Sequence, residues 1–404
     1  MTVQIVLLCS EGGRGQGHLF RLRRIAEALR EYGATCIAAI ADIKSATGLT
    51  DSVEQVIEAP TANKIGQSPP ALRLSPEARD TCNITMSLWQ MGFWHRQTIT
   101  TKLQGWDQIF AAIRPAAVVA DLAPFALLAA AGRMPTFAVG NGFSVPALIN
   151  GYFTPDTQLA SSKDRAVQDV YFANIRKAFE AAGLASPASI PNALCSDIPC
   201  PATLPALDPK YELRRDRLLP PELDEIPEAI NTAGEDILMY LGTDLDQHQM
   251  AIRAVAATGR KAILYVPTAV NRLVTLPANI ERRKHAFTAD EIASRAGVVV
   301  HHGGVGITHL AALAGVPQMF FYHGPERWAN SRAVWRVGAG GGRAGDDLAK
   351  TNEAARLIQS FLRAEKYRIA ARDWRDNSLK WMAGRRGQDH IAKRIAAKVL
   401  SSGG

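Results

Sequence analysis

Two histidines that follow or precede glycine-rich runs are the residues of this 404-residue sequence best suited to carry chemistry. His18 directly follows the glycine-rich run 11–17 and lies at the start of an apolar pattern with helical spacing. His302 follows the apolar run 298–300 and His301, and it precedes a second glycine-rich run, 303–306. Because an imidazole ring titrates near neutral pH, each histidine could act as a general base or donate a hydrogen bond to an anion.

The first glycine-rich run does not match the common phosphate-binding motifs. A dinucleotide-binding motif that began at Gly13 would have His18 in place of its third glycine, and one that began at Gly15 would have Phe20 there. No Gly-Lys-Ser/Thr follows, as a P-loop requires. The positive end of a helix disfavours an imidazolium, so His18 would stay neutral and able to accept a proton. The alternative is that His18 only caps the helix.

The second run suits a phosphate group. The strand predicted at 297–301 leads into a helix predicted at 308–314, and the turn between them is rich in glycine. Backbone N–H groups at such a helix start bind phosphate or pyrophosphate, and His302 could donate to the same anion. The turn glycines are Gly303, Gly304 and Gly306. The alternative is a tight strand-to-helix turn with two packed histidines.

The segments that must position these residues form two α/β halves. Short apolar runs predict strands, and apolar residues at helical spacing predict helices between them. The strands are expected at 3–9, 35–41, 116–120, 135–139, 236–241, 261–266, 297–301 and 318–322. Nine of the 22 prolines lie between Pro187 and Pro227, which indicates a connection between domains. The pattern predicts two doubly wound, Rossmann-like domains that face each other across a cleft.

The charge of the chain excludes one class of partner. Lys and Arg number 46 against 38 Asp and Glu, a net charge of +8 that would by itself suggest nucleic acid. Residues 361–404 hold eleven of the basic residues and four of the acidic ones, so the excess belongs to the C-terminal segment. We therefore expect no nucleic-acid partner. The segment is interpreted as a solvated helix face, and peripheral contact with an anionic membrane stays open as the alternative.

Other features of the composition predict a cytoplasmic protein. The apolar run at the N-terminus is too short for a signal peptide, and the longest apolar stretch, 116–131, is too short to span a membrane. The five cysteines are scattered, without the spacing of a zinc site. The pair Asp244 and Asp246 precedes a predicted helix and is interpreted as an N-cap, so no metal is expected. The expected location is the cytoplasm, with the inner face of the membrane as the site of any peripheral contact.

The stretch from His301 to Pro317 and the stretch from Tyr322 to Asn330 resemble the nucleotide-sugar signature of GT-B-fold glycosyltransferases. The likeness is greatest to the bacterial branch of UDP-glycosyltransferase-like enzymes that modify natural products, sterols and lipids. It implies an acceptor-binding domain, a proline-rich linker, a donor-binding domain and a basic C-terminal helix that packs back on the first domain. The corresponding boundaries are 1–205, 206–235, 236–375 and 376–404.

The resemblance also implies a reaction: inverting, metal-independent transfer of a sugar from a nucleoside diphosphate sugar, UDP-sugar by default, to a hydroxyl group. The sugar nucleotide is a co-substrate, so no cofactor is expected. His18 falls at the position of the catalytic base and Asp121 at that of its acid partner. The alternative for Asp121 is the N-cap of the following helix. The implied donor-binding residues are Thr243, Phe287, His302, Gly303, Gly304, Gly306, Thr308, Glu326 and Arg327.

Two departures from the family pattern leave the donor sugar open. Leu310 stands where some relatives have a glutamate for the nucleotide ribose, and Glu326-Arg327 stands where relatives usually have Asp-Gln. Because an arginine binds a carboxylate in bidentate fashion, a uronic acid donor is as consistent as glucose or a deoxysugar. For Phe287, a wall beside the nucleobase and ordinary core packing are both open.

The acceptor is indicated only by an aromatic-rich stretch in the first half. Gly17, Trp89 and Trp94 are the candidate acceptor contacts, for a small hydrophobic or lipid acceptor, and core packing is the alternative for the two tryptophans. Two other functions stay open for the whole chain. One is a nucleotide-sugar 2-epimerase of the same fold, and the other is a non-catalytic protein that binds nucleotide sugars.

Overall fold

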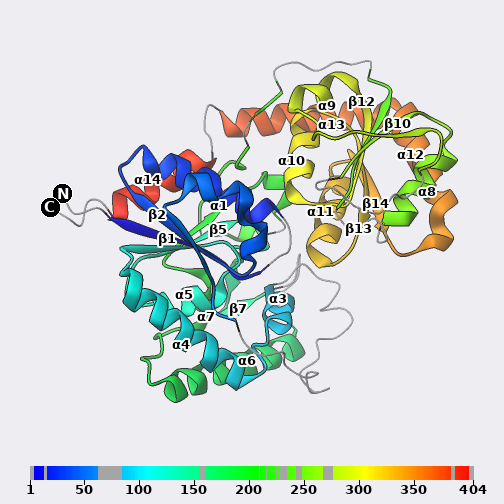
Figure 1. The fold of residues 1–404 in the computed structure, drawn as a ribbon. Helices are drawn as coiled ribbons and strands as arrows, with labels where there is room; N and C mark the ends of the chain where they lie inside the picture. The colour runs from blue at the N-terminus through cyan, green and yellow to red at the C-terminus, as the bar shows by residue number, and fades with distance from the viewer. Residues whose placement is uncertain are drawn as a thin grey trace. The chain divides into compact units, whose positions relative to one another are not determined.

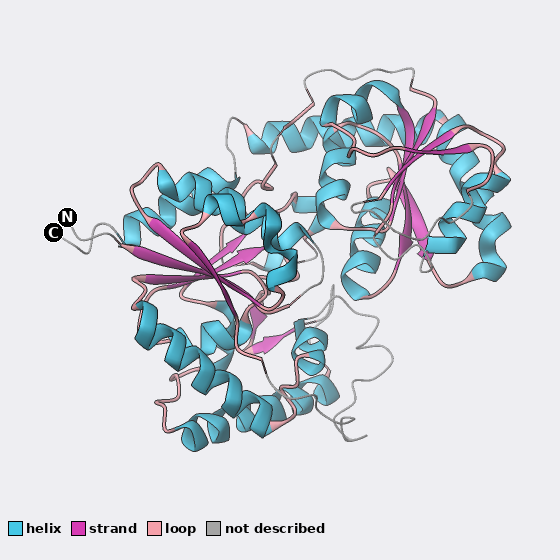
Figure 2. Cartoon of the chain, viewed as in Figure 1, coloured by secondary structure: helices cyan, strands magenta, loops and turns pink. Residues whose placement is uncertain are grey.

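The computed structural model divides the chain into two compact units, each built on a parallel sheet with helices on both faces (Figures 1 and 2). The first unit comprises Met1–Thr203, Lys210–Glu222 and Arg385–Gly404, and the second comprises Leu204–Pro209 and Leu223–Gly384. The structure describes residues 4–12, 16–61, 84–154, 161–208, 210–214, 216–223, 225–227, 234–242, 248–266, 276–383 and 387–399.

The sheet of the first unit has the strand order β3-β2-β1-β4-β5-β8, with all neighbours parallel. Its strands are β1 (Ile5–Ser10), β2 (Thr35–Ile40), β3 (Gln55–Glu58), β4 (Ala117–Ala120), β5 (Thr136–Gly140) and β8 (Ile198–Pro201). The order reverses direction between β1 and β4, and ligands of doubly wound sheets bind at the carboxyl ends of the strands at such a reversal.

Helices cover both faces of this sheet. One face packs against α1 (Gln16–Arg30) and α14 (Gly387–Val399), which contact each other. The apolar residues Ile391, Ile395 and Val399 of α14 are buried there. The other face packs against α3 (Ile84–Gln90), α4 (Arg96–Ile113), α5 (Pro124–Ala130), α6 (Ser162–Ala182) and α7 (Ile190–Cys195). A small antiparallel pair, β6 (Leu148–Ile149) and β7 (Tyr152–Phe153), completes the unit.

The second unit repeats the same strand order, β11-β10-β9-β12-β13-β14, and all its pairings are parallel. Its strands are β9 (Asp236–Tyr240), β10 (Ala262–Tyr265), β11 (Ile280–Arg282), β12 (Ala296–His301), β13 (Gln318–Tyr322) and β14 (Gly340–Ala344). Its helices are α8 (Gln249–Ala257), α9 (Ala289–Arg295), α10 (Val305–Leu313), α11 (Pro325–Arg336), α12 (Thr351–Arg363) and α13 (Glu365–Met382). The reversal of direction lies between β9 and β12.

The prediction of two Rossmann-like sheets is confirmed, and the proline-rich stretch proves more structured than the sequence indicated. It contains α7 and β8, the edge strand Ile198-Pro-Cys-Pro201, where proline is tolerated because no further strand needs its N–H. The segment 206–235, predicted as a linker, is divided between the units. The predicted piece 376–404 is divided as well, since α13 belongs to the second unit and α14 to the first.

Candidate active site

His18 and Asp121 meet at the reversal point of the first sheet. Cys9 of β1 pairs with Ala120 of β4, and the backbone N–H of Asp121 donates to the carbonyl of Cys9 over 2.9 Å. His18 lies in the first turn of α1, and its Nδ1 is 2.9 Å from Oδ1 of Asp121. The Asp121 side chain is fully buried, whereas 23% of the His18 side chain is exposed. The two side chains thus meet where a doubly wound sheet binds its ligand.

The charge state of Asp121 decides which nitrogen of His18 carries a proton. Burial by itself raises the pKa of the Asp121 carboxyl, but Arg21 and His18 more than offset it, so the pKa lies below its ordinary value. An ionised carboxylate can only accept, so a neutral His18 donates from Nδ1 and has Nε2 as its proton acceptor. The N-cap of α5 is Ala123, so Asp121 is not the cap of the following helix.

Two charged residues that the sequence analysis did not assign complete this buried cluster. Nη1 of Arg21 donates to Oδ2 of Asp121 over 2.6 Å, and Nε of Arg21 donates to Oε2 of Glu222 over 2.5 Å. Arg21 lies three residues after His18 on one helix, a spacing that could have indicated that the two share a face. Glu222 lies in the stretch predicted as a linker, and no sequence pattern connects it with the site.

Glu11 fixes the end of β1, from which the His18 loop departs. Its Oε1 accepts from Nε1 of Trp106 over 2.8 Å, and its Oε2 accepts from the backbone N–H groups of Phe125 at 2.8 Å and Ala126 at 3.4 Å. The Glu11 side chain is completely buried, with Nζ of Lys102 at 4.0 Å. One carboxylate therefore joins the end of β1 to α4 and α5.

We expect Glu11→Ala to lower the free energy of unfolding by about 2–4 kcal/mol, because it leaves buried N–H donors unsatisfied and opens a cavity. Urea denaturation followed by circular dichroism measures the change. The control is Glu31→Ala, at an exposed position, which should stay within about 0.5 kcal/mol of the parent. Equal midpoints for the two variants would contradict an anchoring role for Glu11.

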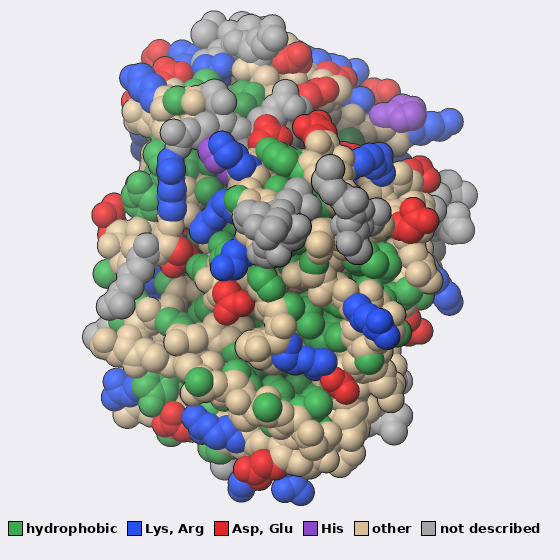
Figure 3. Space-filling view, turned by 90° about the vertical axis from the view of Figure 1, so that its left-hand side faces the viewer, with side chains coloured by type: hydrophobic (Ala, Val, Ile, Leu, Met, Phe, Trp, Pro, Cys, Tyr) green, Lys and Arg blue, Asp and Glu red, His purple; other side chains and the backbone are tan. Residues whose placement is uncertain are grey.

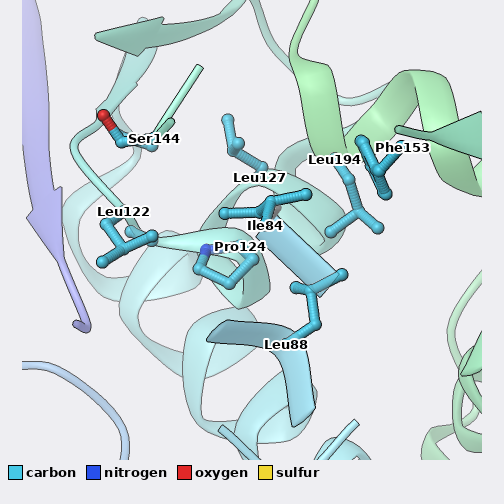
Figure 4. A pocket seen from close by; sticks show the side chains of 10 residues that line it. Ile84, Leu88, Leu122, Pro124, Leu127, Ser144, Phe153 and Leu194 are labelled. Carbon is cyan, nitrogen blue, oxygen red and sulfur yellow. The ribbon is translucent and has the colours of Figure 1, made fainter. Parts of the chain in front are cut away.

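An apolar hollow lies beside Asp121 (Figure 4). Ala120 and Leu122, the neighbours of Asp121 in the chain, both line it. The hollow is partly open to solvent, and the space inside it is small, about 10 Å³. Side chains from α3, α5, β7 and α7 form the rest of the wall: Ile84, Leu88, Pro124, Leu127, Phe153 and Leu194, with Ala123 and Ser144. The predicted contacts Trp89 and Trp94 pack against the core and do not line the hollow, and Gly17 is exposed in the first turn of α1.

The second candidate site lies at the reversal point of the second sheet. His301 of β12 pairs with Tyr240 of β9, His302 follows β12 directly, and Gly242 lies two residues after the end of β9. Gly303 has a φ of +90°, and a Cβ there would lie 3.0 Å from Cβ of Arg327, so this position requires glycine. Gly304 is the N-cap of α10, and Gly306 is exposed in its first turn. Thr243 and the pair Asp244 and Asp246 lie outside the described residues.

Glu326 and Arg327 are charged side chains among the described residues of this second site. Burial, together with the charge of Arg327, lowers the pKa of His302 to about 3, and its Nδ1 is 3.3 Å from the Tyr240 carbonyl. Phe287 is buried, and its ring is edge-on to Tyr265, with 6.5 Å between the ring centroids. The Thr308 hydroxyl donates to the Gly304 carbonyl over 2.8 Å. In the described part of the chain no group of three or more His, Cys, Asp or Glu residues could hold a metal ion.

Comparisons with known proteins agree with this architecture. Residues 251–384 match the family described as "Erythromycin biosynthesis protein CIII-like, C-terminal domain". The matched residues lie within the second unit, which is therefore similar to that family, and the whole chain has the GT-B fold of solved glycosyltransferases. A comparison with curated proteins finds no match.

Three solved structures illustrate the likeness of this GT-B chain to natural-product glycosyltransferases. The calicheamicin glycosyltransferase CalG4 is 16% identical over 100% of both chains, with a TM-score of 0.70. The spinosyn rhamnosyltransferase SpnG is 17% identical over 98% of this chain and 99% of its own, with a TM-score of 0.67, and has been solved with thymidine diphosphate and with the spinosyn aglycone. The glycosyltransferase SnogD from Streptomyces nogalater is 16% identical over 98% and 99%, with a TM-score of 0.61.

Arg327 differs from the other arginines of the GT-B chain's second site. Its Cβ packs on Gly303, and burial lowers the pKa of its guanidinium because the neighbouring Glu326 offsets the burial only in part. It makes no hydrogen bond or ion pair with any residue that the structure describes. By contrast, Arg283 donates to Glu291 over 2.9 Å. A mostly buried guanidinium without a paired carboxylate suits an anionic ligand.

The basic C-terminal segment is only partly a charged surface. Arg394 donates to the Pro199 carbonyl over 3.2 Å, whereas Lys393 and Lys398 are exposed, and Arg385 and Arg386 lie outside the described residues. On the face shown in Figure 3, Lys and Arg side chains lie among Asp and Glu side chains, not in one block. Among the helices that the structure describes, none is long and apolar enough to cross a membrane.

Proposed function

We propose that this GT-B chain transfers a sugar from a nucleoside diphosphate sugar to a hydroxyl of a small apolar acceptor, with inversion at the anomeric carbon and without a metal. The observation that carries the proposal is the 2.9 Å contact between His18 and the buried Asp121, at the ligand-binding end of the first sheet. A partly exposed imidazole held by a buried carboxylate is the arrangement that a general base needs.

The chemical step uses both groups of this pair. Nε2 of His18 takes the hydroxyl proton as the acceptor oxygen attacks the anomeric carbon of the donor. The new carbon–oxygen bond forms on the face opposite the leaving group. The bond from the anomeric carbon to the β-phosphate oxygen breaks, and its electron pair leaves with the nucleoside diphosphate. Asp121 stabilises the imidazolium that results, because its carboxylate accepts from Nδ1 in both states of the ring.

Support for the donor comes from the second site. The turn places the backbone N–H groups of the first turn of α10 after Gly304, and Arg327 lies against Gly303, whose own N–H donates to Nδ1 of His301 over 3.1 Å. These groups can offset the charge of the departing diphosphate without a metal ion. SpnG has been solved with thymidine diphosphate, so we propose a pyrimidine nucleoside diphosphate, UDP or dTDP, as the carrier of the sugar.

Support for the acceptor comes from the hollow beside Asp121. Nine of its ten lining residues are apolar, with Ser144 as the exception, and it lies next to the residue proposed to orient the base. Such a lining favours an apolar molecule that carries a hydroxyl group. We propose a small hydrophobic compound and regard membrane contact through α14 as the weaker option, because only Lys393 and Lys398 of its basic residues are exposed.

Incubation with a panel of UDP- and dTDP-sugars, without acceptor, tests the proposal. We expect at least one donor to be hydrolysed slowly to free sugar and nucleoside diphosphate, because water can replace the acceptor hydroxyl. Chromatography of the nucleotides follows the reaction. A protein that binds none of these donors is not a transferase of this kind. Conversion of a donor to its 2-epimer would instead identify the epimerase activity.

Arg327→Gln is expected to weaken the binding of a nucleoside diphosphate by about tenfold, since a charge-assisted hydrogen bond to phosphate contributes roughly 1–2 kcal/mol. Binding of the corresponding monophosphate should change less, if the guanidinium contacts the β-phosphate. Isothermal titration calorimetry measures both affinities. Arg336→Gln, at an exposed position on the same helix, is the matched control. Equal affinities for parent and Arg327→Gln would exclude a contact between Arg327 and the diphosphate.

A further inference from the structure

Glu222 is a buried carboxyl group that the proton transfer described above does not require. Only 3% of its side chain is exposed. Its Oε2 accepts from Nε of Arg21, and its backbone carbonyl accepts from Nη1 of Arg24 over 2.8 Å. Its Oε1 has no hydrogen-bond partner among the residues that the structure describes. Burial of a carboxyl group with one unpaired oxygen lowers the stability of the fold, so a functional role would explain why Glu222 lies beside the proposed catalytic pair.

Glu222 changes the electrostatic effect of Arg21 on Asp121. One guanidinium faces two carboxylates, with Asp121 at 2.6 Å and Glu222 at 2.5 Å. If Arg21 faced Asp121 alone, it would neutralise most of the negative charge that stabilises a protonated His18. An ionised Glu222 offsets the charge of Arg21 and so leaves the charge of Asp121 available to the imidazole. Arg21 also holds the Asp121 carboxylate in the orientation that brings its Oδ1 to His18.

We propose that Arg21 and Glu222 are positioning residues of the catalytic pair, and that the charge on Glu222 sets how strongly His18 holds a proton. The proposal rests on the roles proposed above for His18 and Asp121. It makes the base strength of His18 a property of four residues: His18, Asp121, Arg21 and Glu222.

The surroundings of Glu222 allow its charge to change near neutral pH. Burial raises the pKa of Glu222 to about 7, and the opposing effect of Arg21 is partly cancelled by the nearby negative charge of Asp121. Arg24 is the other cation that faces it. On the β8 side the Cys200 thiol also feels the charge of Glu222; burial raises the pKa of this thiol to about 12, and Arg394 of α14 lies beside it. Below pH 7 Glu222 is therefore mostly neutral, and His18 becomes a weaker base.

Glu222→Gln tests the proposal, because the amide keeps an acceptor for Arg21 and removes the charge. NMR of protein with isotope-labelled histidine follows the titration of His18, whose signal is assigned by its loss in His18→Asn. We expect the midpoint of the His18 titration to fall by roughly 0.5–1 pH unit in Glu222→Gln. The acid limb of the pH profile of kcat/KM should move by the same amount. Glu212 is an exposed residue of the segment Lys210–Glu222, to which Glu222 also belongs. Glu212→Gln should leave the His18 midpoint and the acid limb of the pH profile unchanged.

The outcomes separate this inference from the proposed function. A His18 midpoint that is equal in Glu222→Gln and in the parent, with both folded, overturns the inference even if sugar transfer is established. A shifted midpoint in a protein that transfers no sugar supports the charge coupling and refutes only the proposed activity. If Glu222→Gln does not fold, the same titration of His18 is measured in the parent protein instead. The His18 signal should then show a second inflection at the pH where the Glu222 carboxyl titrates, and a single inflection overturns the inference.

Discussion

Replacing His18 with alanine is expected to lower kcat by roughly 10²–10⁴-fold, the range that general base catalysis contributes. The acceptor hydroxyl would then have no group to take its proton as it attacks the donor. Donor affinity should stay within about twofold of the parent, because His18 belongs to the first unit and the turn proposed to bind the diphosphate belongs to the second. Initial rates with a reactive donor and calorimetry with its nucleoside diphosphate measure the two effects.

Two results would contradict the assignment of His18. A variant that turns over within tenfold of the parent would show that another group takes the proton. A variant that loses donor affinity as well as rate would show that the effect of the substitution is general. His285→Ala is the control for histidine replacement, because His285 is exposed and lies on neither turn.

Sequence patterns predicted the two candidate sites because each follows a strand that is buried on both faces. Strands 117–120 and 296–301 are apolar except for His301 at the end of the second, and the polar residues that follow mark the carboxyl edge of the sheet. His302 was predicted from this pattern, whereas Asp121 was assigned through the family resemblance. The predicted pairing of His18 with Asp121 depended on the family resemblance, because 103 residues separate them.

The remaining part of the first site depends on contacts that no local pattern records. Glu222 reaches Arg21 across 201 residues of chain, from a proline-rich stretch without periodicity. Glu11 is one polar residue in a glycine-rich loop, and its importance follows only from the three N–H groups that surround its carboxylate. Thr308 shows the converse case, since its spacing suited a ligand contact but its hydroxyl donates within α10.

Asp121→Asn should lower kcat by roughly 10²–10⁴-fold, about as much as the loss of His18 itself. The change is nearly isosteric, so the fold should persist, and Arg21 would still be held by Glu222. Initial rates measure the effect, and nitrogen NMR of the His18 ring reports which nitrogen carries the proton. Asp107→Asn, at a half-exposed residue paired with Arg133, is the control and should keep the parent rate.

The large effect of Asp121→Asn follows from the direction of its hydrogen bonds. Arg21 can only donate, so the amide oxygen of the asparagine would face Arg21 and its NH₂ group would face Nδ1 of His18. Nδ1 must then accept, which places the ring proton on Nε2 and leaves no nitrogen to take the acceptor proton. The variant should therefore hold a correctly placed histidine in the wrong tautomer. A variant that kept the Nδ1 proton and the parent rate would remove Asp121 from the mechanism, whereas a variant with the reversed tautomer and a low rate would connect the arginine directly to the chemistry.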